Sequence, residues 1–187
     1  MSKLLRRDDC LLLLVDVQER LAAAMPEREQ VIGRCRLLAE AARRLAVPVI
    51  ASEQYPKGLG PTVPGLAASL GNAPRLEKLS FSCALEPAIV EAVRASGRRT
   101  LVLGGMEAHV CVLQTALGFR ALGAEVAVVA DAVASRREES RILALERLRE
   151  AGCQVVDCEM VLFEWLERAG TPEFKAISPW IRDGLPP

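Results

Sequence analysis

The chain has 187 residues, of which 51% are hydrophobic and 26% are charged, and its 24 Lys and Arg residues balance its 24 Asp and Glu residues. The chain therefore has no net positive charge of the kind that attracts a nucleic acid or an anionic membrane. The apolar run of residues 10–15 stops at Asp16, well short of the roughly 20 apolar residues of a membrane span. We therefore expect a small-molecule ligand, with no nucleic-acid or membrane partner.

The chain contains a single His, His109, and six cysteines that form no CxxC pair. One His excludes zinc sites built on two or three His, and we expect neither a metal nor a cofactor. The early apolar run is also too short for a usual signal-peptide core. A chain of this size with no recognisable secretion signal typically keeps its thiols reduced, so we expect a cytoplasmic protein.

Apolar runs of strand length alternate with segments of helical period along the chain. Residues 55–74, which hold four prolines and four glycines, predict a loop, and loops of this length are usually functional or mobile. The alternation predicts one α/β domain over residues 1–187, a parallel sheet with helices on both faces. The predicted strands are 10–17, 48–52, 75–78, 100–104, 125–131 and 154–156, and the predicted helices are 26–46, 86–96, 108–122, 137–151, 159–169 and 172–181.

Ligands of such sheets bind outside the carboxyl ends of the strands, which directs attention to Asp16, Lys78 and Asp131. A carboxylate after a buried strand is expensive unless it is paired, although Asp16 would also suit a helix cap. Lys78 is one of only four lysines against twenty arginines. Burial can shift the pKa of a lysine and so fit it to a site. The alternative is that Lys78 is an ordinary solvated surface residue.

Cys111 lies in the first turns of the helix predicted after the strand 100–104. Free N–H groups and the helix dipole would stabilise a thiolate there and lower its pKa from about 8.5. The alternative is an inert buried cysteine. His109 precedes it by two positions, and side chains so spaced on a helix do not face each other. A carboxylate, an ammonium and a thiol at the strand ends together suggest nucleophilic catalysis.

Several ordered motifs resemble the isochorismatase-like cysteine hydrolase superfamily. They are LLLLVDVQERL with Asp16, RLEKLSFSC with Lys78, LVLGGMEAHVCVLQTAL with Cys111, and ADAVASR around Asp131. The segments SEQYPKGLGPTVPGL and GGMEAHVCVLQTAL are similar to the isochorismatase domain-containing subgroup. The similarity runs from about residue 11 to residue 175, which is nearly the whole chain.

The resemblance implies a Rossmann-like three-layer sandwich with a six-stranded parallel sheet in the order 3-2-1-4-5-6. It implies that Asp16 is the general base, Lys78 its electrostatic partner and Cys111 the nucleophile that forms an acyl thioester. A cis peptide would join Met106 to Glu107. The backbone N–H groups of Glu107 and Cys111 would form the oxyanion hole. Relatives form dimers, tetramers or larger rings, so the resemblance also implies a homo-oligomer, with residues 55–74 and the last helices at its interface.

The substrate is less well defined by the resemblance. Candidate substrate-binding residues near the strand ends are Gln18, Leu21, Gln54, Tyr55 and Phe81. Nicotinamidases of this superfamily bind a metal through an Asp and several His after the second strand, where this chain reads SEQY. Leu21 replaces an aromatic residue that often stacks on a ring substrate, which weakens support for a flat heteroaromatic substrate.

An intact Cys111 favours hydrolysis of an amide, or less readily an ester, because isochorismatase itself cleaves a vinyl ether without needing the thiol. The resulting interpretation is a metal-independent cysteine hydrolase acting on a small non-peptide C–N bond. Two alternatives stay open. One is a non-catalytic module that binds a metabolite or protein on the same fold, and the other is an isochorismatase-type vinyl-ether hydrolase.

Overall fold

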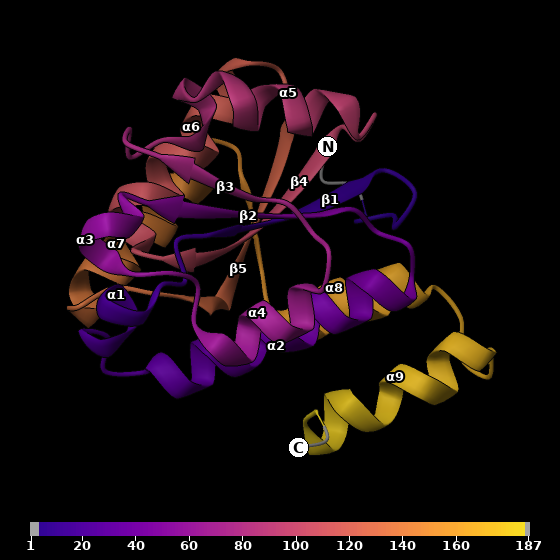
Figure 1. Cartoon of the computed structure of the whole chain (residues 1–187). Helices are drawn as coiled ribbons and strands as arrows, with labels where there is room; N and C mark the ends of the chain where they lie inside the picture. The colour runs from indigo at the N-terminus through magenta and orange to yellow at the C-terminus, as the bar shows by residue number, and fades with distance from the viewer. Residues whose placement is uncertain (1–3, 186–187) are drawn as a thin grey trace.

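The computed structural model describes residues 4–185, which form one six-stranded sheet enclosed by helices (Figure 1). All five strand pairs are parallel and the order is β3-β2-β1-β4-β5-β6. The predicted α/β fold and strand order are thus confirmed; the ends of the predicted domain, residues 1–3 and 186–187, lie outside the described residues. The strands are β1 (Cys10–Val15), β2 (Val49–Gln54), β3 (Arg75–Lys78), β4 (Thr100–Met106), β5 (Glu125–Ala134) and β6 (Gln154–Val156).

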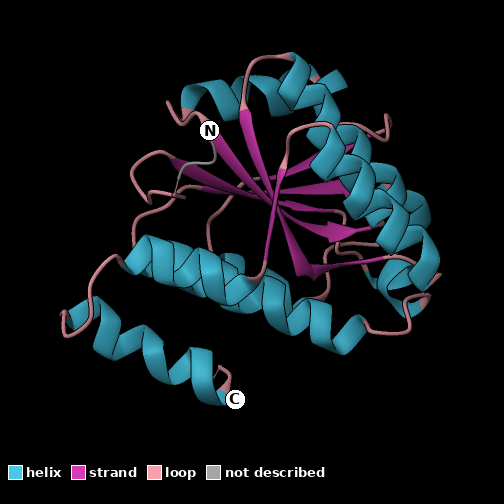
Figure 2. Cartoon of the chain, turned by 180° about the vertical axis from the view of Figure 1, so that it is seen from behind, coloured by secondary structure: helices cyan, strands magenta, loops and turns pink. Residues whose placement is uncertain are grey.

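Helices cover both faces of the sheet, which explains why β1 is apolar at every position (Figure 2). Because side chains alternate along a strand, Leu12 and Leu14 join the core on one face and Leu11 and Leu13 join the core on the other. The first face is covered by α2 (Arg28–Arg44) and α8 (Cys158–Leu166), with α4 (Pro64–Leu70) packed beside α2 and α9 (Pro172–Asp183) packed on the outside of α2 and α8 (Figure 1). The second face is covered by α5 (Pro87–Ala95), α6 (Leu113–Ala121) and α7 (Glu138–Glu150).

The predicted loop over residues 55–74 is wrong in part, because this stretch contains the short helices α3 (Pro56–Leu59) and α4. Each begins with a proline, which suits the first helical position because its missing N–H would be unpaired there anyway. Leu66 and Leu70 of α4 are buried against the core. A further short helix, α1 (Glu19–Ala23), follows β1 and was not predicted.

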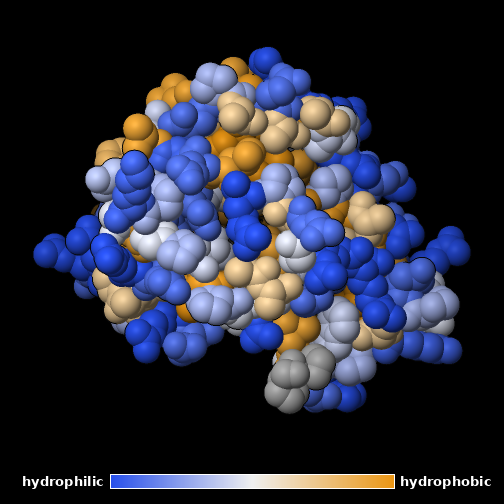
Figure 3. All heavy atoms as spheres, viewed as in Figure 1, coloured by the Kyte–Doolittle hydropathy of each residue, from blue (hydrophilic) through white to orange (hydrophobic). Residues whose placement is uncertain are grey.

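The carboxyl ends of β1 and β4 lie side by side at the centre of the sheet, where the strand order reverses. This is the topological switch point at which doubly wound sheets bind ligands. On the face seen in Figure 3, hydrophilic residues are interspersed with smaller apolar groups. Within residues 4–185, no helix is both long and apolar enough to cross a membrane.

Candidate active site

Asp16 immediately follows β1 and forms a fully buried ion pair with Lys78 at the end of β3. The distance from Lys78 Nζ to Asp16 Oδ2 is 2.7 Å, and neither side chain is exposed to solvent. The Ser52 hydroxyl donates to Asp16 Oδ1 at 2.7 Å. Asp16 has a positive φ of 53°, a left-handed conformation that Asp tolerates better than most residues. The sharp turn therefore places the carboxylate at the edge of the sheet.

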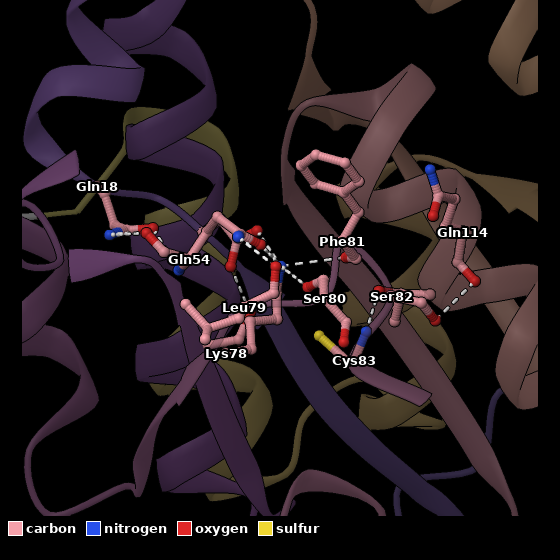
Figure 4. A network of polar contacts seen from close by, with 12 residues as sticks. Gln18, Gln54, Lys78, Leu79, Ser80, Phe81, Ser82, Cys83 and Gln114 are labelled. Atoms are coloured by element: carbon pink, nitrogen blue, oxygen red, sulfur yellow. Dashed lines mark hydrogen bonds and ion pairs between the residues drawn. The ribbon is translucent and has the colours of Figure 1, made fainter. Parts of the chain in front are cut away.

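Lys78 is held by three further oxygen atoms in addition to Asp16 (Figure 4). Its Nζ donates to Gln54 Oε1 at 2.6 Å and to the carbonyl oxygens of Ser80 and Phe81 at 3.2 and 3.1 Å. A lysine ammonium has three hydrogens and no acceptor, so these oxygens and the carboxylate fully occupy it. The cation is fixed in place and is not a mobile surface charge.

Cys111 lies in η2 (Ala108–Val112), a π-helical turn that leads directly into α6. Its thiol lies near enough to the carboxylate of Asp16 for each group to shift the pKa of the other. The three residues that the sequence singled out for catalysis therefore meet at one point, although they come from three separate segments of the chain. Only 5% of Cys111 is exposed, so access to the thiol is narrow.

The prediction that the helix start lowers the pKa of Cys111 is wrong. Burial raises the pKa of this thiol to about 12, the nearby Asp16 carboxylate raises it further, and Lys78 only partly offsets both effects. Burial also raises the pKa of Asp16 against the opposing influence of Lys78 and Ser52. The thiol is therefore protonated at rest, and it becomes a nucleophile only by giving its proton to the base beside it.

The turn between β4 and η2 has an unusual backbone. The Met106–Glu107 peptide bond is cis, and Gly105 has a φ of 126°. The N–H of Glu107 has no acceptor among residues 4–185. Its carboxylate accepts from the backbone N and the Nε of Arg136 at 3.1 and 3.0 Å. Near the start of a helix, first-turn N–H groups such as that of Cys111 also lack a partner four residues back.

Gly105→Ala should prevent stable folding, because a Cβ at this position would collide with the backbone carbonyl of Val15. The strand cannot move away, since it sits at the centre of the sheet. We expect a loss of more than about 4 kcal/mol in the free energy of unfolding, measured by urea denaturation. Gly97→Ala is the matched control: Gly97 also has a positive φ, but a Cβ there meets nothing within 4 Å, so only about 1–2 kcal/mol of backbone strain is expected. Equal losses for the two variants would contradict this interpretation.

Gln18 and Gln54 are tied into the polar network around the site. Gln18 is fully buried and clamps the backbone of Gln54, donating to its carbonyl at 3.0 Å and accepting from its N–H at 2.7 Å. Gln18 also donates to the carbonyl of Gly60 at 2.7 Å. Gln54 in turn accepts from Lys78 and donates to the carbonyl of Leu79 at 2.8 Å. Both amides therefore position Lys78.

The other three predicted substrate contacts lie in different settings. Leu21 is half-buried and packs against the core on the α2 face of the sheet. Tyr55 and Phe81 are each about half exposed. The ring of Phe81 extends away from the polar network that its own carbonyl helps to form (Figure 4).

Two further polar residues near the strand ends have structural partners. Asp131 accepts from the backbone N of Cys158 at 2.8 Å and pairs with Arg34 at 3.1 Å, so it anchors the start of α8. His109 contacts the hydroxyl of Ser135 at 2.9 Å. In the part of the chain that the structure describes, no group of three or more His, Cys, Asp or Glu side chains is arranged to hold a metal ion.

Sequence reasoning missed Arg136 and Cys83. Arg136 binds the carboxylate of Glu107, and no spacing in the sequence indicates that contact. Cys83 is fully buried, and its thiol is close enough to interact with Ser52 and Asp16. The segment RLEKLSFSC contains it, but the sequence alone did not distinguish this cysteine from the other buried thiols.

Comparisons with known proteins agree with this fold. The isochorismatase domain family matches residues 10–160. Isochorismatase domain-containing protein 2 of Xenopus laevis is 37% identical over 176 residues, covering 94% of this chain and 84% of its own length.

Two solved structures extend the likeness to three dimensions. MAR1 ribonuclease from Caenorhabditis elegans has a TM-score of 0.91 at 34% identity, covering 98% of this chain and 94% of that one. The YcaC gene product of Escherichia coli, described as an octameric hydrolase of unknown specificity, has a TM-score of 0.85 at 27% identity, covering 98% and 86%. This chain belongs to the isochorismatase family, in the superfamily of isochorismatase-like hydrolases, and is most similar to its isochorismatase domain-containing members.

Proposed function

We propose that the protein is a metal-independent cysteine hydrolase that cleaves a small amide, or less readily an ester, through an acyl thioester on Cys111. The observation that carries this proposal is that the Cys111 thiol lies beside a buried carboxylate, Asp16, which is itself 2.7 Å from a buried lysine. A nucleophile, an adjacent base and a group that orients the base are the three parts that covalent catalysis requires.

The first half of the reaction forms the acyl-enzyme. Asp16 takes the proton of the Cys111 thiol as sulfur attacks the carbonyl carbon of the substrate. The N–H groups of Glu107 and Cys111 stabilise the oxyanion, a contribution commonly worth about 2.7–4 kcal/mol per donor. The tetrahedral intermediate then collapses, the C–N bond breaks, and protonated Asp16 returns its proton to the leaving amine.

The second half releases the product. Asp16 takes a proton from a water molecule, the resulting hydroxide attacks the thioester carbonyl, and the C–S bond breaks. The sulfur recovers the proton from Asp16, so the enzyme returns to its starting state with a free acid released. Lys78 stays charged throughout, and the buried cation keeps Asp16 ionised enough to act as a base despite its burial.

The rate should rise with pH as Asp16 loses its proton. Burial raises the pKa of this carboxyl above its ordinary value of 3.8, so the midpoint of the rise in kcat/KM is expected above that value. Ammonia release from a panel of small primary amides, from formamide to benzamide, measures it. A profile that instead stays low through neutral pH and rises only in the alkaline range, toward the raised pKa of the Cys111 thiol, would show that a free thiolate, and not proton transfer to Asp16, controls the rate.

A ribonuclease activity is the second candidate, because a solved structure that is 34% identical to this chain is described as a ribonuclease. The geometry supports it less well. Cys111 is 5% exposed, so a polynucleotide has no easy entry to the thiol, and the zero net charge of the whole chain gives no overall attraction to a polyanion. Incubation with single-stranded RNA distinguishes the two: cleavage that is lost in Cys111→Ala would favour this second activity.

We also propose that the protein forms a homo-oligomer, as the octameric description of one solved relative suggests. Four large apolar side chains at or near the carboxyl ends of β2 and β3 are more than half exposed, and such a grouping is typical of an interface. They are Tyr55, Leu79, Phe81 and Leu85. Light scattering that gives the mass of a single chain would contradict this proposal.

A further inference from the structure

A cavity of about 800 Å³ lies at the opposite edge of the sheet from Cys111. Its walls include Asp9, Thr100, Glu125 and Gln154, which stand at the amino ends of β1, β4, β5 and β6. The volume is within the range of sites that bind small molecules. Because the catalytic residues follow the carboxyl ends of the strands, this cavity is not part of the candidate active site.

One side of the cavity is apolar. Val90 and Val93 of α5 line it together with Phe119 and Leu122 at the end of α6. Phe119 is buried. Leu122 is half exposed, which leaves its apolar side chain in contact with water. This wall offers contact to the body of an apolar ligand, which would gain free energy by covering Leu122.

The charges around the cavity are unevenly matched. Each acidic residue that lines it already pairs with an arginine, whereas Arg94 and Arg98 have no ion pair or hydrogen bond from their guanidinium groups within residues 4–185. The cavity therefore has a surplus of positive charge. The existing pairs are Asp8 with Arg6 at 3.5 Å, Asp9 with Arg99 at 2.8 Å and Glu125 with Arg120 at 3.6 Å.

Arg98 is held by a tight turn at the end of α5. Gly97 has a φ of 68°, and the N–H of Arg98 donates to the Ser96 hydroxyl at 3.2 Å. The side chain is half-buried, so less conformational entropy is lost when it binds a ligand than for a fully exposed arginine. Arg94 lies one helical turn earlier, at the end of α5, where its charge also suits the helix dipole. Arg98 lies beyond the helix and has no such role, so it is the stronger candidate for binding an anionic ligand.

From this arrangement we infer that the cavity binds a small molecule with an apolar body and one anionic group, a carboxylate or a phosphate monoester. A guanidinium forms paired hydrogen bonds with either group. The apolar body would lie against Val93, Phe119 and Leu122. The site is independent of the hydrolase reaction proposed above and requires no residue of that reaction.

Titration with 2-naphthoate, followed by amide chemical shifts of the full-length protein, tests the inference. We expect shifts at Val93, Phe119 and Leu122, and at least about tenfold weaker binding of the neutral analogue 2-naphthalenemethanol, because a charge-assisted hydrogen bond is worth about that factor. Arg98→Gln should weaken the binding of 2-naphthoate by a similar factor. Arg147→Gln on the exposed face of α7 makes the same charge change away from the cavity and should leave binding unchanged.

A parallel titration with 2-naphthyl phosphate distinguishes the two anionic groups, because the tighter ligand identifies the preferred one. Three results would overturn the inference: equal binding of 2-naphthoate and 2-naphthalenemethanol, equal binding by wild type and Arg98→Gln, or shifts confined to residues around Cys111. Absence of binding together with a change of oligomeric state in Arg98→Gln would show that a second copy of the chain covers the cavity, and would also overturn it. None of these outcomes depends on whether Cys111 hydrolyses amides.

Discussion

Cys111→Ala should lower amide hydrolysis by a factor of about 10⁴ or more, the loss typical when a catalytic nucleophile is removed. The thiol is the group that attacks the substrate in this mechanism. The other nucleophilic groups near Asp16, the Ser52 hydroxyl and the Cys83 thiol, are even less exposed than Cys111, so we do not expect them to replace it. Cys111 is buried, but the substitution removes only a sulfur atom, so we expect a folded variant. Ammonia release from the amide panel measures the activity, and circular dichroism checks the fold.

Cys153→Ala is the matched control for this experiment. Cys153 is also buried, in the core on the same face of the sheet as Cys111, but it contacts no catalytic residue. Its variant should retain full activity. Activity on isochorismate that survives Cys111→Ala would instead favour the vinyl-ether hydrolase, and the absence of turnover across the panel by wild-type protein would favour the non-catalytic binding module.

Lys78→Met should cost about 3–5 kcal/mol in the free energy of unfolding at neutral pH, the usual penalty for leaving one half of a buried ion pair alone. The substitution strands the Asp16 carboxylate, whose partner is 2.7 Å away in the wild type. It also removes the donor that satisfies Gln54 Oε1 and the carbonyls of Ser80 and Phe81. The rate of hydrolysis should also fall in Lys78→Met, because Asp16 without its lysine keeps a proton and no longer serves as a base.

The penalty should depend on pH in a defined direction. The pKa of Asp16 is raised in the folded protein, and removal of the lysine raises it further. A group with a raised folded pKa binds its proton more tightly when folded, so the stability it contributes is complete at low pH and is lost as pH rises through the folded pKa. The difference between wild type and Lys78→Met should therefore be smallest in acid and grow toward neutral pH.

Urea denaturation at several pH values measures this difference. The double variant Lys78→Met with Asp16→Asn removes both charges and provides the control, because it leaves no isolated ion. It should be more stable at neutral pH than Lys78→Met alone, which a double-mutant cycle expresses as a coupling between the two sites. A penalty independent of pH, or a double variant no more stable than the single one, would contradict the assigned ion pair.

Much of the fold was predictable because it depends on local pattern. The run Cys10–Val15 is apolar at every position, which is typical of a strand covered on both faces, and alternation with helical segments predicts a parallel sheet. Asp16, Lys78 and Cys111 were found because the carboxyl ends of parallel strands meet at one edge. The helix α4 was missed because four prolines and four glycines in residues 55–74 obscure the short apolar pattern of Leu66 and Leu70.

Other features of the site depend on contacts between distant segments. The pKa of Cys111 was expected to fall because a helix start is visible in the sequence, whereas the burial and the Asp16 charge that raise it are not. Gln18 was predicted only as a substrate contact, and its hydrogen bonds to the backbone of Gln54, 36 positions away, could not be foreseen. Arg136 reaches Glu107 from 29 positions away. Local spacing contains no information about such pairs.

The most direct test of the acyl thioester is partitioning by hydroxylamine. The best amide of the panel and the methyl ester of the same acyl group are hydrolysed in hydroxylamine, and the ratio of hydroxamate to free acid is measured for each. Both substrates pass through the same Cys111 thioester in this mechanism, so the two ratios should be identical and both activities should vanish in Cys111→Ala. Different ratios, or activity that survives the substitution, would contradict a common acyl-enzyme.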